Sequence, residues 1–578
     1  MKKYLKYIKP YLIYFILGPI FMLTEVFGEI WIPRLMSFII NNGVANRDVA
    51  YIFKTGGVML CACLVMVTGG IGGAYFAAKA SVSFSADLRS DLFKKIQGFS
   101  FADLDEFSTG SLVTRLTNDL QQIQNMIAMS LRMALRAPGM LVGGFIMALG
   151  LNSELAMILL IVIPLLGISI FLIMRTAYPL FGKMQTALDN LNNGIKETLT
   201  NIRVVKSFVR EDHELQKFTG LNDELKDKTL KAMNIVIMTM PVMTVFMNIT
   251  SCAVVWFGGN RIIAGDMPVG DLTAFITYVT QILMSLMMVA MVILTSSRSM
   301  ASFARVSELL KFEPELNDEN AASRDKLVES GSIEFKNVAF AYKKTNVLKN
   351  ISFKVEPGET IGILGPTGCG KTSMVQLIPR LYDVTEGEVL VDGTDVRDYS
   401  LKNLREGVGM VLQYNTLFAG TVYENLRWGN EDADDEEVRR FAAYAQADGF
   451  VSEFKEGYEH MIEQGGSNVS GGQKQRLCIA RALLKKPKIL ILDDSTSAVD
   501  TATDAKIRKA FAEKIPGTTK IIIAQRISSV QDADRILVLD NGRIDAFDTH
   551  DNLLRSNAIY QDIYESQIKG GGDFDQPA

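Results

Sequence analysis

Six long apolar stretches lie in the first half of the chain: Tyr11–Ile40, Tyr51–Ala78, Leu131–Leu149, Ala156–Met174, Ile235–Phe257 and Leu272–Thr295. Each is close to or longer than the roughly 20 residues that a helix needs to cross a bilayer. The first stretch is too long for a cleaved signal sequence and contains Glu25, Glu29 and Arg34, so we expect it to stay in the mature protein. The pattern predicts six transmembrane helices.

The segments between these stretches differ in length and charge. Four lysines precede the first stretch, Lys2, Lys3, Lys6 and Lys9, whereas the connections after the first, third and fifth stretches are short and contain few charges. Cytoplasmic loops retain Lys and Arg, so we expect both termini in the cytoplasm. The other two connections have about 50 residues each and keep helical periodicity. They predict helices that extend well beyond the membrane and turn near residues 101–107 and 201–208.

The hydrophobic pattern changes after the sixth stretch. Residues 313–330 are polar, acidic and without apolar periodicity, which predicts a linker. Beyond it, short apolar runs such as Ile333–Phe335 and Thr360–Leu364 alternate with helical segments, a pattern typical of an α/β sheet. The expected organisation is an all-α six-helix transmembrane domain with long cytoplasmic helical extensions, a linker, a second domain of α/β type and a disordered tail, at residues 1–312, 313–330, 331–568 and 569–578.

Charge excludes one large class of partner. The 578 residues include 60 Lys and Arg against 64 Asp and Glu, which gives a net charge of −4. A nucleic-acid-binding chain normally has a basic excess. We therefore expect no nucleic acid as partner. The membrane-spanning stretches, in contrast, imply membrane lipids as partners, and a small hydrophobic or amphipathic substrate is expected from the alternatives given below.

Two acids lie inside the first apolar stretch. Glu25 and Glu29 are four residues apart and therefore share one helix face. Intramembrane acids often have a function, so a site for a cationic substrate is one interpretation, and an interfacial position or a pairing with Arg34 is the other, which we favour. The sixth stretch contains four methionines that suit an adaptable binding wall or, as we favour, ordinary helix packing: Met284, Met287, Met288 and Met291.

The most specific motif of the second half is Gly365-Pro-Thr-Gly-Cys-Gly-Lys371-Thr372, which follows a strand and begins a helix. It matches the P-loop, in which backbone N–H groups surround phosphates, Lys371 reaches the β- and γ-phosphates and the Thr372 hydroxyl binds Mg²⁺. Residues 488–493 form an apolar strand that ends in Asp493, the Walker B arrangement for the Mg²⁺ shell. Residues 469–473 form a small-residue loop before a helix, whose free N–H groups can meet an anion.

In the order and spacing of these motifs and membrane segments, the chain resembles an ABC exporter half with fused membrane and nucleotide-binding domains. The resemblance extends from the first apolar stretch to about residue 567, and it implies a second exporter half as partner and ATP and Mg²⁺ as cofactors. It implies that Tyr342 stacks on adenine and that Thr372, Gln413 and Asp493 serve the Mg²⁺. The nucleotide-binding residues that it implies are Tyr342, Gly365, Pro366, Thr367, Gly368, Cys369, Gly370, Lys371, Thr372, Ser373 and Gln413.

The resemblance also implies residues that act across the dimer. The signature loop, which in this family closes on ATP held by the opposite subunit, corresponds to Ser470, Gly471, Gly472 and Gln473. Asp500 lies in a segment that resembles the D-loop. The turns at 101–107 and 201–208 resemble the coupling helices that transmit motion between the domains.

Two positions depart from the family pattern. Asp494 stands where the family has the glutamate that activates water, and Gln525 stands where it has a histidine directed at the γ-phosphate. Aspartate reaches about 1.5 Å less far than glutamate. A well-placed general base accelerates a reaction roughly 10²–10⁴-fold, so we expect impaired hydrolysis at this chain's own site. The favoured hypothesis is a heterodimer in which this chain supplies a degenerate site and an intact signature loop for the partner's competent site.

Three functions follow from these alternatives. The favoured one is ATP-driven export of amphipathic or hydrophobic compounds across the cell membrane by alternating access, as half of a heterodimer. The second is a homodimeric lipid or multidrug exporter that uses Asp494 as an atypical base. The third is an ATP-gated regulatory subunit or channel.

Overall fold

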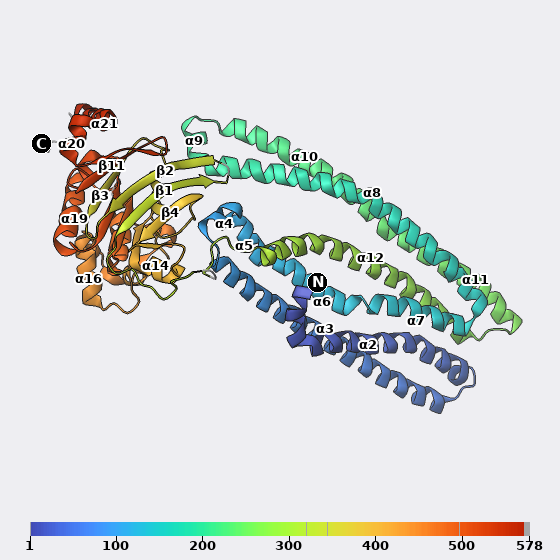
Figure 1. The fold of residues 1–578 in the computed structure, drawn as a ribbon. Coiled ribbons are helices and arrows are strands. Elements are labelled where there is room, and N and C mark those ends of the chain that lie inside the picture. Colours follow the sequence, from blue (N-terminus) through green and yellow to red (C-terminus); the bar gives the residue numbers. More distant parts are fainter. Residues whose placement is uncertain (1, 319–320, 344, 496, 571–578) are drawn as a thin grey trace. The chain divides into compact units, whose positions relative to one another are not determined.

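The computed structural model describes residues 2–318, 321–343, 345–495 and 497–570 (Figure 1). The chain forms two compact units. The first comprises the residues up to Gln97 together with Thr109–Phe312, and the second comprises Gly98–Ser108 together with the residues from Glu313 onward. Most of the tail that was predicted to be disordered, residues 569–578, lies outside the described residues.

The first unit is built from helices alone: α1 (Lys2–Ile8), α2 (Leu12–Phe38), α3 (Val49–Gln97), α5 (Thr109–Thr114), α6 (Leu120–Met133), α7 (Arg136–Leu151), α8 (Ser153–Thr200), α9 (Ile202–Ser207), α10 (Glu211–Ile237), α11 (Thr239–Ala264) and α12 (Val269–Lys311). Within the described residues, six helical segments are long and apolar enough to cross a membrane. The prediction of six transmembrane helices is therefore confirmed.

Several of these helices are much longer than a bilayer is thick. α3 has 49 residues and α8 has 48. At about 1.5 Å per residue each extends for more than twice the roughly 30 Å of a hydrocarbon core. α8 and α10 run side by side and are joined through the short helix α9 (Figure 1). The predicted helical extensions are thus present.

Local sequence signals explain where these helices begin and end. The Asn152 side chain accepts hydrogen bonds from the backbone N–H groups of Glu154 and Leu155 and so caps the start of α8. Gly265 ends α11 in a left-handed conformation, with φ of 85°. Both signals lie at the short connections, so the chain reverses direction there within a few residues.

The core of the first unit is formed mainly by α2, α7, α8, α11 and α12. Tyr278 of α12 is fully buried, and its hydroxyl donates a 2.7 Å hydrogen bond to the Ile30 carbonyl of α2. Near the short-loop end of the same two helices, Arg34 lies 3.3 Å from Asp271. The polar contacts between α2 and α12 therefore fix the register of the two helices.

One alternative in the sequence interpretation is wrong. The intramembrane acids Glu25 and Glu29 do not pair with Arg34, because both form ion pairs with Arg136 at the start of α7. Successive helical residues are about 100° apart, so Arg34, five residues after Glu29, faces a different neighbour. That neighbour is α12, where Asp271 binds it.

The second unit has a six-stranded sheet in the order β12-β11-β3-β10-β9-β6 and a four-stranded antiparallel sheet in the order β2-β1-β4-β5. The strands of the larger sheet are β3 (Thr360–Leu364), β6 (Val408–Val411), β9 (Ile489–Asp493), β10 (Thr519–Ile523), β11 (Arg535–Asp540) and β12 (Arg543–Asp548). The other strands are β1 (Ile333–Tyr342), β2 (Thr345–Val355), β4 (Glu386–Val391), β5 (Thr394–Asp395), β7 (Gly420–Thr421) and β8 (Met461–Ile462). The predicted α/β domain is confirmed.

The helices that follow β3 in the second unit pack on the larger sheet and on one another (Figure 1). They are α13 (Lys371–Gln376), α14 (Leu401–Gly407), α15 (Val422–Arg427), α16 (Asp435–Tyr444), α17 (Asp448–Glu453), α18 (Gly471–Leu484), α19 (Thr501–Lys514), α20 (His550–Ser556) and α21 (Ala558–Gly570). All residues of β9 and β10 are buried, which explains the apolar runs Ile489–Leu492 and Ile521–Ile523 within them. Because β10 runs parallel to both β3 and β9, the carboxyl ends of these three strands meet at one edge.

The short helix α4 (Phe101–Glu106) packs as part of the second unit. Ser100 begins it with a capping box that includes Asp103. The Tyr382 hydroxyl donates a 2.8 Å hydrogen bond to Asp105, and the Tyr382 ring meets Phe101 edge-on. α4 and α9 lie within the two turns, 101–107 and 201–208, in which we expect coupling helices.

Candidate nucleotide site

The loop between β3 and α13 has the backbone shape that a phosphate-binding loop requires. Gly365, Gly368 and Gly370 all adopt positive φ values, of 149°, 83° and 103°. A Cβ atom on Gly365 would lie 2.1 Å from the Leu539 carbonyl oxygen, so that position accepts only glycine. The glycines of the motif are therefore required by the fold of the loop as well as by the approach of a ligand.

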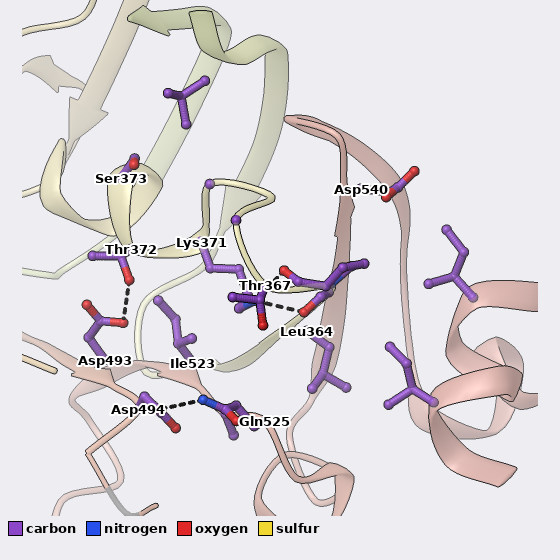
Figure 2. A pocket seen from close by; sticks show the side chains of 18 of the residues that line it. Leu364, Thr367, Lys371, Thr372, Ser373, Asp493, Asp494, Ile523, Gln525 and Asp540 are labelled. Carbon is purple, nitrogen blue, oxygen red and sulfur yellow. Dashed lines mark hydrogen bonds between the residues drawn. The ribbon is translucent and has the colours of Figure 1, made fainter. Parts of the chain in front are cut away.

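Two side chains at the start of α13 fix the inner surface of this loop. Lys371 Nζ donates hydrogen bonds of 2.7 and 2.9 Å to the carbonyl oxygens of Gly365 and Pro366. The Thr372 hydroxyl donates a 2.9 Å hydrogen bond to Asp493 Oδ1, at the end of β9 (Figure 2). A single cation and a hydroxyl are thus held at the loop where phosphate oxygens would lie.

Asp494 follows directly on β9, and Gln525 is the second residue after β10. Asp494 has φ of 50°, a left-handed conformation that aspartate tolerates better than most residues. Gln525 Nε2 donates a 2.8 Å hydrogen bond to Asp494 Oδ2, and Figure 2 shows the two side chains directed at each other. Burial raises the pKa of Asp494, and the Gln525 hydrogen bond opposes this by favouring the carboxylate.

The backbone of Gln525 is also bound by a residue of α21. Gln567 of α21 donates a 2.7 Å hydrogen bond from Nε2 to the Gln525 carbonyl. The Oε1 atom of the same side chain accepts a 2.8 Å bond from the Ile527 backbone N–H. The segment after β10 is therefore fixed at its backbone as well as at its side chain.

These residues surround one cavity of about 1140 Å³. It is lined by most of the residues that the sequence singles out, namely Tyr342, Gly365, Pro366, Thr367, Gly368, Gly370, Lys371, Thr372, Ser373, Gln413, Asp493, Asp494 and Gln525. Tyr342 lies beside Ser373, with 3.2 Å between the two hydroxyl oxygens. Cys369 is the one residue of the loop motif that does not line the cavity, because its side chain is buried beneath the loop.

The cavity also has walls that the sequence interpretation missed. Val347, Leu364, Ile523, Ala524 and Asp540 come from strands of the core or their ends, and four more residues come from α21: Ala558, Ile559, Asp562 and Ile563. None of them belongs to a recognisable motif. The apolar residues of α21 recur at a spacing of three to four, which predicts a helix but gives no indication of the surface that the helix contacts.

A second group of predicted residues lies outside this cavity. Ser470 caps α18, its hydroxyl accepting a 3.3 Å bond from the Gln473 N–H while Gln473 Oε1 accepts a 2.9 Å bond from the Ser470 N–H. A Cβ atom on Gly472 would lie 2.8 Å from the Ala498 carbonyl oxygen, so the loop packs closely against the segment that ends at Asp500. None of residues 470–473, nor Asp500, lines the cavity. The nucleotide-binding unit thus has two separate surfaces.

Comparison with known proteins identifies this arrangement. The family described as the ABC transporter transmembrane region matches residues 11–286, and the family described as ABC transporter matches residues 348–497. An uncharacterized ABC transporter ATP-binding protein of Bacillus subtilis, YfiB, is 40% identical over 570 residues, which cover 98% of this chain and 99% of YfiB. The chain belongs to the ABC transporter family. Its fused membrane and nucleotide-binding domains are those of the exporter type.

Two further relatives of this ABC transporter agree with that assignment. YgaD of Bacillus subtilis, provisionally named as a multidrug export ATP-binding/permease protein, is 33% identical over 577 residues and is covered over 99% of its length. A solved structure of a bacterial Atm1-family ABC exporter with ATP bound has a TM-score of 0.79 to this chain, with coverage of 99% of both chains and 24% sequence identity. This last likeness shows that the fold is the exporter fold.

The residues of the transporter's cavity fit a magnesium ion bound together with a nucleotide. Asp493 Oδ2 is buried and has no hydrogen-bond partner among the described residues. Burial raises the pKa of Asp493, the Thr372 hydrogen bond lowers it, and the neighbouring Asp494 raises it further. A divalent cation would supply the missing contact and neutralise this carboxylate. No cluster of three or more acidic, His or Cys side chains suited to a metal occurs in the described part of the chain, so phosphate and water oxygens would have to complete the shell.

Proposed function

We propose that this chain is one half of an ATP-driven exporter of amphipathic or hydrophobic compounds, paired with a different half whose own site hydrolyses ATP. The observation that supports this most directly is the 2.8 Å hydrogen bond between Gln525 and Asp494. Two side chains bond each other at the positions where the family has an acid directed at water and a histidine directed at the γ-phosphate.

This pair is poorly suited to proton transfer. A general base must lie within hydrogen-bond reach of the attacking water, and aspartate is shorter than glutamate by about 1.5 Å. The raised pKa of Asp494 would favour a base, but geometry has to be satisfied first. The Gln525 amide neither accepts nor releases a proton as an acid or base would. Both replacements therefore weaken the same step, while the groups that bind phosphate remain.

The signature loop gives the chain its second task. Ser470 and its capping partner Gln473 leave the first N–H groups of α18 directed outward at the helix terminus, where an anion is stabilised. In the proposed dimer this surface closes on ATP bound by the partner, and the partner's signature loop closes on the ATP held at Lys371. Closure drives the membrane helices through α4 and α9, and hydrolysis at the partner's site resets the cycle.

The membrane half supports a small amphipathic cargo. A relative that covers almost the whole chain is provisionally named for multidrug export. The methionine-containing helix α12 offers flexible apolar side chains to a cavity, including Met284 and Met288. The lysines before the first transmembrane segment favour a cytoplasmic nucleotide-binding domain, with the six helices in the cell membrane.

Co-expression with an exporter half that has Asp-Glu and histidine at the corresponding positions tests the asymmetric dimer. Dye uptake into inverted vesicles and ATP hydrolysis are measured for two matched complexes. Replacing Asp494 with alanine should change both rates by less than about twofold, whereas replacing the partner's catalytic glutamate with glutamine should reduce both about 100-fold or more. Equal losses in the two complexes would overturn the proposal.

The chain on its own distinguishes the alternatives. Vigorous transport-coupled ATP hydrolysis by the purified chain, lost in Asp494→Ala, would establish a homodimer that uses aspartate as its base. Ion currents supported by a non-hydrolysable ATP analogue, without dye uptake, would establish an ATP-gated channel.

A further inference from the structure

A charged cluster lies deep inside the membrane unit. The Arg136 guanidinium is 3.0 Å from Glu25 Oε1 through Nη1 and 3.1 Å from Glu29 Oε2 through Nη2. Counted along α2 and α7 from their short-loop ends, the three residues lie about 14–22 Å into the membrane at 1.5 Å per residue. That depth is near the middle of a hydrocarbon core of roughly 30 Å, where ionised side chains are costly.

The cluster is not electrically balanced. Two carboxylates share one guanidinium, so one negative charge stays uncompensated. Arg132, one turn before Arg136, is exposed and has no ion pair with either acid in the described part of the chain. An unbalanced charge in a medium of low dielectric is strongly destabilising unless a counter-charge joins it or one carboxyl group takes up a proton. A cationic ligand would balance the cluster with both carboxylates ionised.

The cluster also has more buried hydrogen-bond acceptors without a partner than buried donors without a partner, counted over the described residues. Among the residues that the structure describes, Glu25 Oε2 and Gln281 Oε1 of the cluster are buried acceptors without a donor, and Arg136 Nε is the cluster's one buried donor without an acceptor. Gln281 of α12 uses its Nε2 atom in a 3.1 Å bond to the Glu29 carbonyl, which leaves the amide oxygen for another partner. Glu25 faces α3, where the absence of a side chain at Gly70 gives its carboxyl group room. A ligand that completes this cluster has to donate hydrogen bonds.

A cavity of about 320 Å³ adjoins the cluster. Its polar side is formed by Glu29, Arg136 and Gln281 together with Thr277, Thr280 and Ser285, and its apolar side by Met140, Ile276, Met284 and Met288. A volume of this order suits a small organic molecule. Thioether side chains adapt to apolar groups of different shape, so the apolar side does not demand one particular skeleton.

We propose that this cavity binds the transported compound as a monovalent organic cation, with an N–H-bearing ammonium group on an apolar body. Glu29 and the Gln281 amide oxygen accept hydrogen bonds from the ammonium group, and the methionines contact the apolar body. Glu25 is a positioning residue, because its ion pair holds Arg136 and so leaves the charge of Glu29 for the ligand. This inference rests on the proposed export function and adds the substrate class.

Three fluorescent probes that differ only at one end of the molecule test the charge preference: dansylcadaverine, its neutral N-acetyl derivative, and the anionic dansyl-aminohexanoate. Binding is titrated by dansyl fluorescence to the full chain in nanodiscs, alone and with its partner half, without nucleotide. A charge-assisted hydrogen bond contributes about 1.5–3 kcal/mol, so the cation should bind roughly 10-fold to 100-fold more tightly than the neutral probe. Equal affinity for the cationic and neutral probes would overturn the inference.

Substitutions in the cavity test whether the preference for the cationic probe arises there. Glu29→Gln should abolish the cation preference while leaving binding of the neutral probe unchanged, whereas Glu154→Gln, an exposed acid at the start of α8, should leave both unchanged. Glu29→Gln also makes the cluster neutral, so the melting temperature of the variant should be at least that of the wild type. An unchanged or higher melting temperature would show that a loss of binding does not come from misfolding. Met288→Ala should weaken all probes alike, and Met157→Ala, at an exposed methionine of α8 outside the cavity, should not. A cation preference that survives in Glu29→Gln would also overturn the inference.

The binding assay does not depend on hydrolysis or on transport. If dye export fails in the co-expressed complex while the cation preference persists, the proposed export function is wrong and the cavity assignment stands. If export proceeds but Glu29→Gln binds and exports the amine as the wild type does, the substrate class is wrong and the export function stands.

Discussion

The nucleotide cavity has a phosphate side, with Lys371 and Asp493, and a hydrolysis side, with Asp494 and Gln525. The two sides differ in whether a buried polar atom is left without a hydrogen-bond partner among the described residues. On the phosphate side, Lys371 is held by two carbonyl oxygens and the Cys369 sulfur of the loop, and Asp493 Oδ2 has no partner among the described residues. On the hydrolysis side, Asp494 and Gln525 already bond each other. Unsatisfied groups remain available to a ligand, whereas Asp494 and Gln525 already satisfy each other, which is the contrast that the proposed asymmetric dimer predicts.

The two sides also differ in what holds them. The phosphate side is shaped by backbone conformation, since Gly365 and Gly370 adopt angles that other residues avoid. The hydrolysis side is braced by distant contacts, because Gln567 of α21 binds the backbone on both sides of Arg526. The phosphate-binding conformation is therefore encoded within a few neighbouring residues. The position of Gln525, in contrast, depends on Gln567 of α21, which lies 42 residues further along the chain.

The largest expected effect is on the phosphate side. Lys371→Ala removes the ammonium group that two carbonyl oxygens now hold in the loop. Two charge-assisted bonds that this group would donate to ATP phosphates are lost with it. Bonds of this kind contribute about 1.5–3 kcal/mol each, so ATP affinity should fall roughly 1,000-fold. Equilibrium binding of a fluorescent ATP analogue to the purified chain measures this.

Lys509→Ala is the matched control, because Lys509 is an exposed lysine of α19 in the same domain. It should leave the affinity unchanged. If Lys371→Ala retains the wild-type affinity, the phosphate side is not the binding side, and the contrast between the two sides fails.

The next effect should appear on the hydrolysis side. Combining Asp494→Glu with Gln525→His breaks the bond between the two side chains and extends the carboxylate by about 1.5 Å toward water. Hydrolysis is measured in a complex whose partner has its own catalytic glutamate replaced by glutamine. The rate should rise about 100-fold, the lower end of what a well-placed base contributes, while ATP affinity stays the same.

Asp494→Glu alone separates the effect of a longer carboxylate side chain from the effect of losing the hydrogen bond to Gln525. It should give a smaller gain, because Gln525 remains available to bond the longer carboxylate. Absence of any gain in the double variant would mean that the pair does not limit hydrolysis, and that the bracing of the segment by Gln567 or the opposing signature loop does.

The sequence predicted those features that depend on neighbouring residues. Six apolar runs gave six membrane-spanning helices, and one glycine-rich motif placed Lys371 and Thr372 on a strand-to-helix turn. The parallel register of β9 and β10, in which Asp493 lies opposite Ile523, explains why the residues that follow them meet. Each of these outcomes follows from periodicity or from local backbone conformation.

Contacts between distant parts of the chain could not be predicted in this way. Arg136 lies 107 residues from Glu29, and only the packing of α7 on α2 decides that it, and not Arg34, pairs with the acid. Tyr382 lies 277 residues from Asp105 and holds α4 within the second unit. The apolar pattern of each helix indicates that it has a buried face, but not which neighbour covers that face.

The smallest expected effect concerns how the phosphate side responds to pH. Burial is the main reason that the pKa of Asp493 is raised, and only its carboxylate form binds Mg²⁺. As pH falls through this raised pKa, the gain in ATP affinity that Mg²⁺ provides should shrink, whereas affinity measured in EDTA should not. Asp493→Asn should remove the Mg²⁺ gain at every pH, and parallel titrations with and without Mg²⁺ check this.

The same shift predicts the sign of a stability change. A folded-state pKa above the unfolded value means that the ionised Asp493 destabilises the ligand-free fold at neutral pH, and that this penalty disappears as pH falls. Asp493→Asn should therefore raise the melting temperature by about 2–4 °C for each kcal/mol of penalty removed. Asp392 is the opposite case: burial raises its pKa, but hydrogen bonds from Ser330 and neighbouring backbone N–H groups lower it overall. Asp392→Asn should lower the melting temperature, and equal shifts in the two variants would show that Asp493 is not an uncompensated charge.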